Sequence, residues 1–131
     1  MENIDKRLFE LFRGLLLQPA TKGYDYAKKA VIMKIAAEER GETITIGNIY
    51  KALAESNGVS YNSVERAIRY VKLKSLNNPK ARPMVLKIFG NVIPQKYSNN
   101  DFICSMYEYL KYNDNEENVV IDTEEGANNN G

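Results

Sequence analysis

The sequence predicts an all-α protein of about six helices, and three observations lead to this prediction. Apolar residues recur every three to four positions through most of the first 112 residues, which is the spacing of amphipathic helices. Proline and glycine interrupt that pattern at short intervals, as they do between helices. The segment from Tyr50 to Arg69 has the pattern of two helices joined by a glycine turn.

Two helices are expected before that segment. The first spans residues 3–17, and Pro19 ends its pattern; its apolar face holds Ile4, Leu8, Leu11, Phe12 and Leu15. The second runs from about Lys22 to Glu39 and stops at Gly41. Its lysines, Lys28, Lys29 and Lys34, should lie mostly outside. Residues 43–46 alternate between threonine and isoleucine, which permits a short extended piece.

The segment from Tyr50 to Arg69 meets the needs of a helix-turn-helix. Ala54 is small enough for two helices to touch, Gly58 tolerates the positive φ of the turn, and Val64 is an apolar anchor in the second helix. Ile68 continues the apolar face of that helix. We expect the motif to occupy about residues 46–76, and this predicts a fold of the winged-helix-like superfamily.

Two further helices should follow the break at residues 77–79. A short one runs from Met84 to Phe89 and ends at Gly90. The last one is capped by Ser98 and continues to Tyr112, and its apolar residues are Phe102, Ile103, Met106, Tyr109 and Leu110. These residues serve equally well as core or as a self-association face. We therefore expect a helical domain over residues 1–112.

The net charge of +1 conceals two oppositely charged parts. Residues 1–112 hold all 18 basic and 11 of the 17 acidic residues, so they carry +7. Residues 113–131 hold six acidic and no basic residues, so they carry −6. The body suits a polyanionic partner, whereas the composition of residues 113–131 predicts a disordered acidic tail. The tail either remains solvated, which we favour, or folds back and competes with DNA.

Composition argues against several other classes of function. Histidine is absent, which removes histidine-based catalysis and histidine-ligated metals, and no glycine-rich phosphate loop is present. We therefore expect no enzyme, no metal and no cofactor. The single cysteine, Cys104, excludes an internal disulfide and should be buried. Apolar runs such as residues 15–17 are too short for a membrane span, and the N-terminus lacks a signal-peptide core, so a cytoplasmic protein is expected.

Five segments of the chain match a known family in order. They are VERAIR at residues 64–69, Lys22-Gly23-Tyr24 with Tyr26, Ile49-Tyr50 with Leu53-Ala54, Phe89-Gly90, and KYSNNDFI at residues 96–103. Through these segments the chain resembles the C-terminal DNA-binding effector domain of the stage-zero sporulation protein A family of sporulation response regulators. The strongest match is VERAIR, which is similar to the family's recognition-helix core. The resemblance covers residues 8–112.

The chain departs from the family's pattern in three respects. The family's proteins carry an N-terminal phospho-receiver domain, and we expect none here because 131 residues leave no room for it. Ser63 occupies the position of a family arginine that helps to read bases. The segment Gly58–Ser60 also replaces a threonine-rich turn. Sequence preference in DNA should therefore differ from the family's.

The resemblance implies that the second helix of the motif reads DNA bases through Glu65 and Arg66, with Arg66 on guanine and Glu65 on cytosine. We assign roles to twelve residues: base reading to Glu65, Arg66, Ser63, Asn62 and Tyr61, phosphate contact to Ser60, Arg69 and Lys72, and the scaffold to Ala54, Gly58, Val64 and Ile68. Two local alternatives stay open. Glu65 and Arg69 can form a surface ion pair beside a solvated Arg66. Asn62 can replace Ser60 as the helix cap, with Glu65 completing a capping box.

The resulting prediction is a sequence-specific double-stranded DNA-binding transcription regulator that acts at the bacterial nucleoid. RNA polymerase and a second copy of the chain on tandem sites are the candidate additional partners. The alternative is a protein-interaction module or antagonist that keeps the fold and has lost base-specific reading. Ser63 and the acidic tail motivate that alternative.

Overall fold

The computed structural model describes residues 3–113, and within that range the protein consists of helices and loops without a strand. The helices are α1 (Ile4–Gly14), α2 (Lys22–Glu39), α3 (Ile46–Asn57), α4 (Tyr61–Leu76), α5 (Arg82–Ile88) and α6 (Asn99–Tyr112), with two 3₁₀ turns, η1 (Pro79–Ala81) and η2 (Pro94–Lys96). The predicted all-α fold of about six helices is confirmed. None of the described helices is long and apolar enough to cross a membrane.

The first two helices follow the predicted pattern with one difference. α1 ends at Gly14, earlier than expected, although Leu15 and Leu17 in the following turn remain buried. α2 has the predicted bounds; the hydroxyl of Thr21 accepts a hydrogen bond from the backbone N–H of Tyr24 and caps its N-terminus. Residues 43–45 form no strand. Thr45 instead caps α3 by accepting from the backbone N–H of Asn48 at 3.1 Å.

The predicted helix-turn-helix corresponds to α3 and α4. Gly58 follows α3 with φ +65°, the left-handed conformation that favours glycine. The backbone N–H of Val59 then donates to the carbonyl of Ala54 at 3.1 Å, which closes the helix end. Ser60 is extended and caps α4. The turn therefore forms for the reason that the sequence indicates.

The C-terminal helices begin close to their predicted positions. α5 starts at Arg82, two residues early, because Pro83 is tolerated in the first turn of a helix. The hydroxyl of Ser98 accepts from the backbone N–H of Asp101 at 2.9 Å and caps α6 as predicted. Asn113 is the last described residue and caps the other end of α6. Residues 114–131, which hold the charged part of the predicted acidic tail, lie outside the described range.

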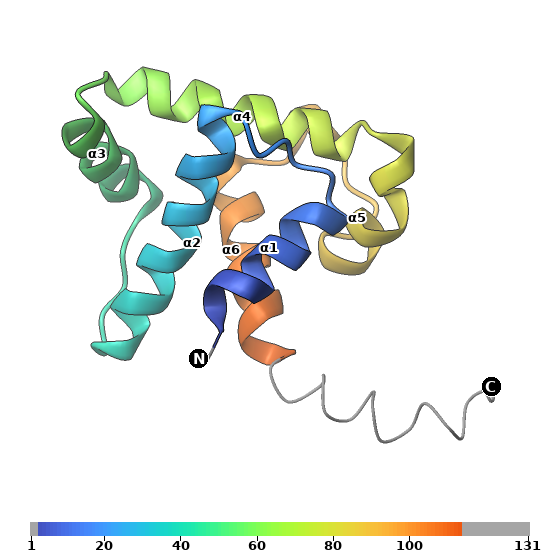
Figure 1. Ribbon diagram of the computed structural model, residues 1–131, viewed down its shortest axis with the longest axis horizontal. Coiled ribbons are helices and arrows are strands. Elements are labelled where there is room, and N and C mark those ends of the chain that lie inside the picture. Colours follow the sequence, from blue (N-terminus) through green and yellow to red (C-terminus); the bar gives the residue numbers. More distant parts are fainter. Residues whose placement is uncertain (1–2, 114–131) are drawn as a thin grey trace.

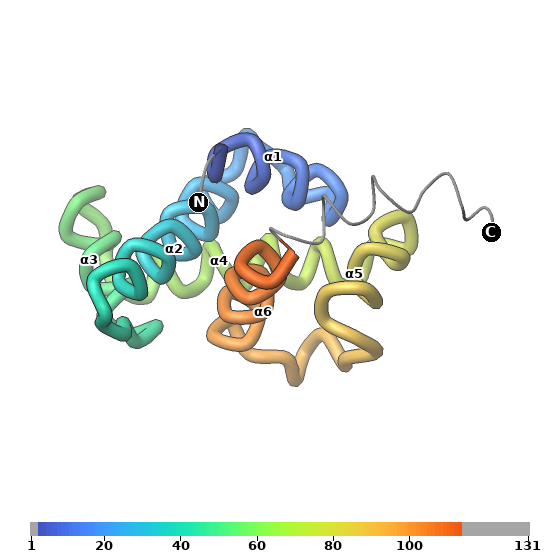
Figure 2. The backbone as a smooth tube through the Cα atoms, turned by 90° about the horizontal axis from the view of Figure 1, so that it is seen from below, coloured from blue at the N-terminus to red at the C-terminus, as the bar shows by residue number. Residues whose placement is uncertain are grey.

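Figure 1 shows α4 lying across one end of α2 and of α6, and Figure 2 shows α1, α2 and α6 as neighbours beneath it. The core draws on every α-helix; one fully buried side chain from each is Phe12, Val31, Ile49, Ile68, Val85 and Phe102. The apolar stripe of α6 is core as well, since Phe102, Ile103, Met106 and Leu110 are all buried. It therefore offers no self-association face.

Two burial predictions need correction. Cys104 is only partly buried, because it lies at the edge of the α6 stripe and makes a weak contact with the side chain of Asn100. Lys34 is half-buried rather than outside, and its ammonium donates to the carbonyl of Ile44 at 3.0 Å. That bond holds the loop after α2 against the helix.

A close helix contact lies where the first turn of α2 meets α4. A Cβ atom placed on Gly23 would stand 2.1 Å from the carbonyl oxygen of Ala67 and 2.7 Å from Cγ1 of Val71. Neither the carbonyl oxygen of Ala67 nor the buried side chain of Val71 can move away unless α4 shifts. Glycine at position 23 is therefore required by the approach of α2 to the backbone of α4, and this contact sets how α4 lies on the domain.

We predict that Gly23→Ala destabilises the protein by about 1–3 kcal/mol, because the added methyl overpacks the α2–α4 contact. Urea denaturation of the purified protein measures this. Gly47→Ala is the matched control: its Cβ would meet only side-chain hydroxyls at ordinary contact distances, that of Tyr61 at 3.4 Å and that of Thr45 at 4.0 Å. Alanine is also the better helix former, so stability should change by less than about 1 kcal/mol. Equal stability of both variants would contradict the predicted requirement for glycine.

Candidate nucleic-acid interface

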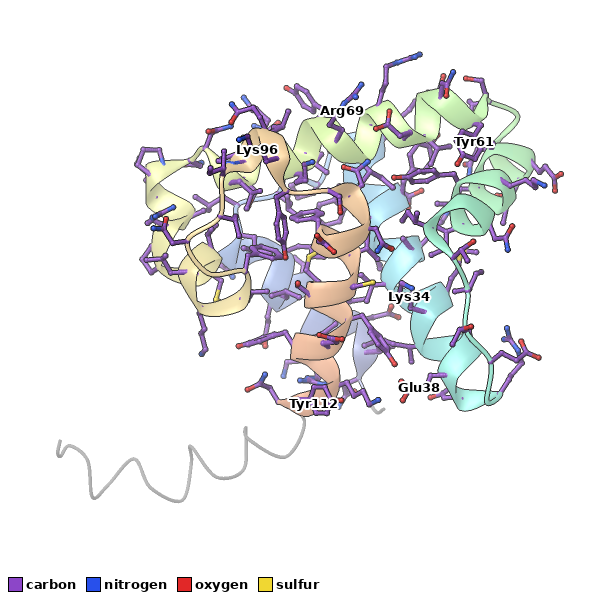
Figure 3. The ribbon with its side chains drawn as sticks, turned by 180° about the vertical axis from the view of Figure 1, so that it is seen from behind. Lys34, Glu38, Tyr61, Arg69, Lys96 and Tyr112 are labelled. Atoms are coloured by element: carbon purple, nitrogen blue, oxygen red, sulfur yellow. The ribbon has the colours of Figure 1, made fainter. Side chains whose placement is uncertain are left out.

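α4 presents one buried and one exposed face. Val64 and Ile68 are fully buried, and Ala54 of α3 packs at the crossing of the two helices, so these side chains lie where a scaffold needs them. The opposite face carries the exposed residues Asn62, Arg66, Arg69 and Tyr70. Figure 3 shows Tyr61 at the start of α4 beside α3 and Arg69 farther along α4. The polar side of the helix is therefore free for a partner.

The N-terminus of α4 is capped by Ser60. Its Oγ accepts from the backbone N–H of Ser63 at 3.0 Å and donates to Oγ of Ser63 at 2.9 Å. This excludes the alternative in which Asn62 is the cap and Glu65 completes a capping box. The hydroxyl of Ser63 already has a hydrogen-bond partner in Ser60. The side chain of Asn62, the residue before it, is exposed.

The exposed charges of α4 show an ion pair and an unpaired arginine. A carboxylate oxygen of Glu65 lies 3.5 Å from a guanidinium nitrogen of Arg69, one turn away. The surface ion pair that the sequence left open is therefore formed. Ion pairs this exposed contribute about 0–1 kcal/mol, so a phosphate or a base edge can compete with it. Within residues 3–113, Arg66 makes no ion pair or hydrogen bond, and its guanidinium extends into solvent.

Tyr61 is held against α3. Its ring packs edge-to-face on Tyr50 with the centroids 5.2 Å apart, and it remains 45 % exposed. An edge-to-face aromatic pair stabilises by about 0.5–1.5 kcal/mol beyond burial. This contact anchors the first turn of α4 to α3.

Lys72 does not lie on the surface where we expected it. It is only 4 % exposed, and its ammonium donates to the carbonyl of Tyr97 in the loop before α6. Burial lowers the pKa of Lys72, and the nearby charge of Arg69 lowers this pKa further. The helix period explains the misplacement: Lys72 falls beside Ile68 and Val71, on the inner side of α4. An ammonium engaged in this way is not available to a phosphate.

Asn99 is a structural residue of this interface that sequence reasoning missed. Its Nδ2 donates to the hydroxyl of Tyr50 at 2.9 Å and to the backbone carbonyl of Glu65 at 3.1 Å. It therefore joins the start of α6 to α3 and to the middle of α4. Burial raises the pKa of Tyr50, and the bond from Asn99 opposes this shift. The pair Asn99-Asn100 gives no sequence signal as to which amide is buried.

The family model described as "Sporulation initiation factor Spo0A C terminal" matches residues 8–110, from α1 to the last turn of α6. The chain belongs to this family. The Spo0A C-terminal family consists of sporulation-related DNA-binding domains that regulate transcription, which agrees with the resemblance seen in the sequence. The comparison with curated proteins gave no match.

We predict that Asn99→Ala destabilises the Spo0A-like domain by about 1–2 kcal/mol, because Tyr50 and the carbonyl of Glu65 both lose a buried donor. Thermal and urea denaturation measure the change. Asn100→Ala is the control, since Asn100 is exposed one position farther along the same helix. If the two variants were equally stable, Asn99 would not be the link between α3, α4 and α6.

Proposed function

We propose that this protein is a sequence-specific double-stranded DNA-binding transcription regulator whose α4 enters the major groove. The observation that carries the proposal is the exposed guanidinium of Arg66, which has no ion-pair partner among residues 3–113, on the outer face of the second helix of a helix-turn-helix. Membership of a DNA-binding family and the charge of +7 on residues 1–112 support it. Helices of this kind place their N-terminal half against base edges.

The side chains of α4 divide into readers and phosphate contacts. Arg66 forks onto O6 and N7 of a guanine, and Glu65 accepts from N4 of a cytosine while Arg69 turns toward a phosphate. Opening the Glu65–Arg69 pair costs little because Arg69 is exposed and Glu65 is only partly buried. Asn62, Ser63 and Tyr61 border the groove in the first turn and adjust sequence preference.

The phosphate backbone meets the start of α4. The free backbone N–H groups of a helix N-terminus attract a phosphate, and Ser60 lies at that end. Lys72 is no longer part of this proposal, because its ammonium is engaged inside the domain. Arg69 is then the basic contact on α4 that neutralises a phosphate.

Binding to tandem sites by two copies and contact with RNA polymerase remain part of the proposal. The apolar residues of α6 are core, so a second copy has to use other surfaces. A DNA-bound regulator acts at the nucleoid. Selection from randomised duplexes with the purified chain tests the proposal, and a defined recovered motif supports it.

We predict that Arg66→Ala weakens binding to the selected motif by about 1–3 kcal/mol, roughly five- to 150-fold, and relaxes preference at one guanine. Arg40→Ala is the control: it removes the same charge, but Arg40 follows the far end of α2, roughly 27 Å along that helix from its contact with α4. Equal losses in both variants would mean that Arg66 acts only through charge.

The salt dependence of DNA affinity distinguishes Arg69 from Lys72, the two basic residues that the sequence predicts as phosphate contacts. We predict that Arg69→Gln makes the slope of log affinity against log salt less steep by about 1, because one phosphate contact is lost. Lys72→Met should leave the slope unchanged. Titrations at several salt concentrations measure both slopes. A reduced slope for Lys72→Met would show that this lysine leaves the interior on binding.

A further inference from the structure

An apolar groove lies where α1 joins α2. Its volume is about 350 Å³, and its lining includes Phe9 and Arg13 of α1, Leu16, Leu17 and Pro19 of the connecting loop, and Tyr24 of α2. Phe9 is 51 % and Leu16 is 39 % exposed. Large apolar side chains gathered in one exposed hollow usually mark a place where something binds.

Leu16 lies in this groove with a strained backbone conformation. Its φ is +59°, in the left-handed region, and it follows α1 at the position where helices most often use glycine. The backbone N–H of Leu17 donates to the carbonyl of Phe12, and that of Leu16 to the carbonyl of Arg13, both at 3.0 Å. Glycine would adopt this turn without strain. What leucine adds is an apolar side chain in the groove.

The groove continues toward α4. A second hollow of about 90 Å³ shares Leu16, Leu17 and Gln18 with the first and is also lined by Tyr70 and Lys74. Tyr70 is 52 % exposed. The combined groove therefore has an apolar middle and a basic residue at each end, Arg13 and Lys74. Within residues 3–113 neither of these two has an acidic partner. A complementary peptide is apolar in the middle and acidic on both sides.

The chain itself contains such a peptide. Residues 117–122 read Glu-Asn-Val-Val-Ile-Asp, three branched apolar residues between two carboxylates. We propose that this segment, 117–122, binds the groove formed by α1 and the α1–α2 loop. Its branched side chains then cover Phe9 and Leu16, and its carboxylates lie near Arg13 and Lys74.

The segment is within reach of the groove. Asn113, at the end of α6, lines a hollow together with Glu10 and Leu11 of α1, so the described chain ends beside α1. Five residues separate Asn113 from Val119, and a chain of that length spans up to about 20 Å when extended, against about 10–12 Å for the width of a helix. In contrast, Figure 3 shows Tyr112 at the opposite end of the molecule from Arg69.

Paramagnetic broadening in the full chain tests the proposal without DNA and therefore independently of the proposed function. A nitroxide is attached at position 123 in a Thr123→Cys, Cys104→Ser variant labelled with ¹⁵N, and the sample is diluted with unlabelled protein that carries no nitroxide. The amide signals of Phe9, Leu16 and Tyr24 should lose most of their intensity relative to the reduced label. Replacing Val119, Val120 and Ile121 by serine should restore them, although all charges remain.

Three other results would overturn the proposal. Broadening of Asn62 and Arg66 instead would mean that the segment lies over the recognition helix. If the groove residues' amide signals were broadened but recovered on dilution with unlabelled protein, a second copy of the chain would be the occupant of the groove. Uniform signals without broadening at the groove would mean that the segment does not bind it. Leu16→Gly serves as the groove-side variant, because glycine suits the turn and removes only the side chain, and it should also restore the signals.

Discussion

The approach of α2 to the backbone of α4 at Gly23 is the contact on which the rest of the structure depends. Helix axes that pass this close leave no room for a side chain, and Ala67 and Val71 of α4 occupy the space that a Cβ would need. The contact fixes the rotation of α4 about its own axis. It therefore decides that Val64 and Ile68 face the core while Arg66 and Arg69 face outward.

Buried polar side chains extend this constraint to the surrounding elements. Ser75 of α4 donates to the carbonyl of Leu15 at 2.7 Å, Lys72 to that of Tyr97, and Asn99 to that of Glu65. Arg7 similarly donates to the carbonyl of Leu110 at 2.9 Å. Three of these carbonyls, those of Leu15, Tyr97 and Leu110, lie at or near helix ends, where backbone groups lack partners within a helix. These three bonds each satisfy such a group, and all four tie one element to another without adding apolar area.

Much of this architecture could be predicted from the sequence, because helices with one apolar face and strong breaks between them leave few alternatives. The bounds of α2 and the turn at Gly58 follow from capping and conformational rules that act within a few residues. Lys72 and Asn99 could not be predicted, since burial of a polar side chain depends on an acceptor supplied by a distant segment. The ion pair of Glu65 with Arg69 was one of two local outcomes, and spacing alone did not choose between them. Leu16 in a left-handed turn contradicts the usual preference for glycine, so no local rule finds it.

The central claim is that the α2–α4 contact sets the pose of the recognition surface, and the specific DNA affinity of two destabilised variants tests it most directly. Gly23→Ala disturbs the contact, whereas Leu110→Ala removes core volume at the far end of α6. Both are measured on the selected duplex at a temperature where circular dichroism shows each to be folded. The account predicts a large loss of affinity for Gly23→Ala and near wild-type affinity for Leu110→Ala. Equal affinities for the two variants would contradict it.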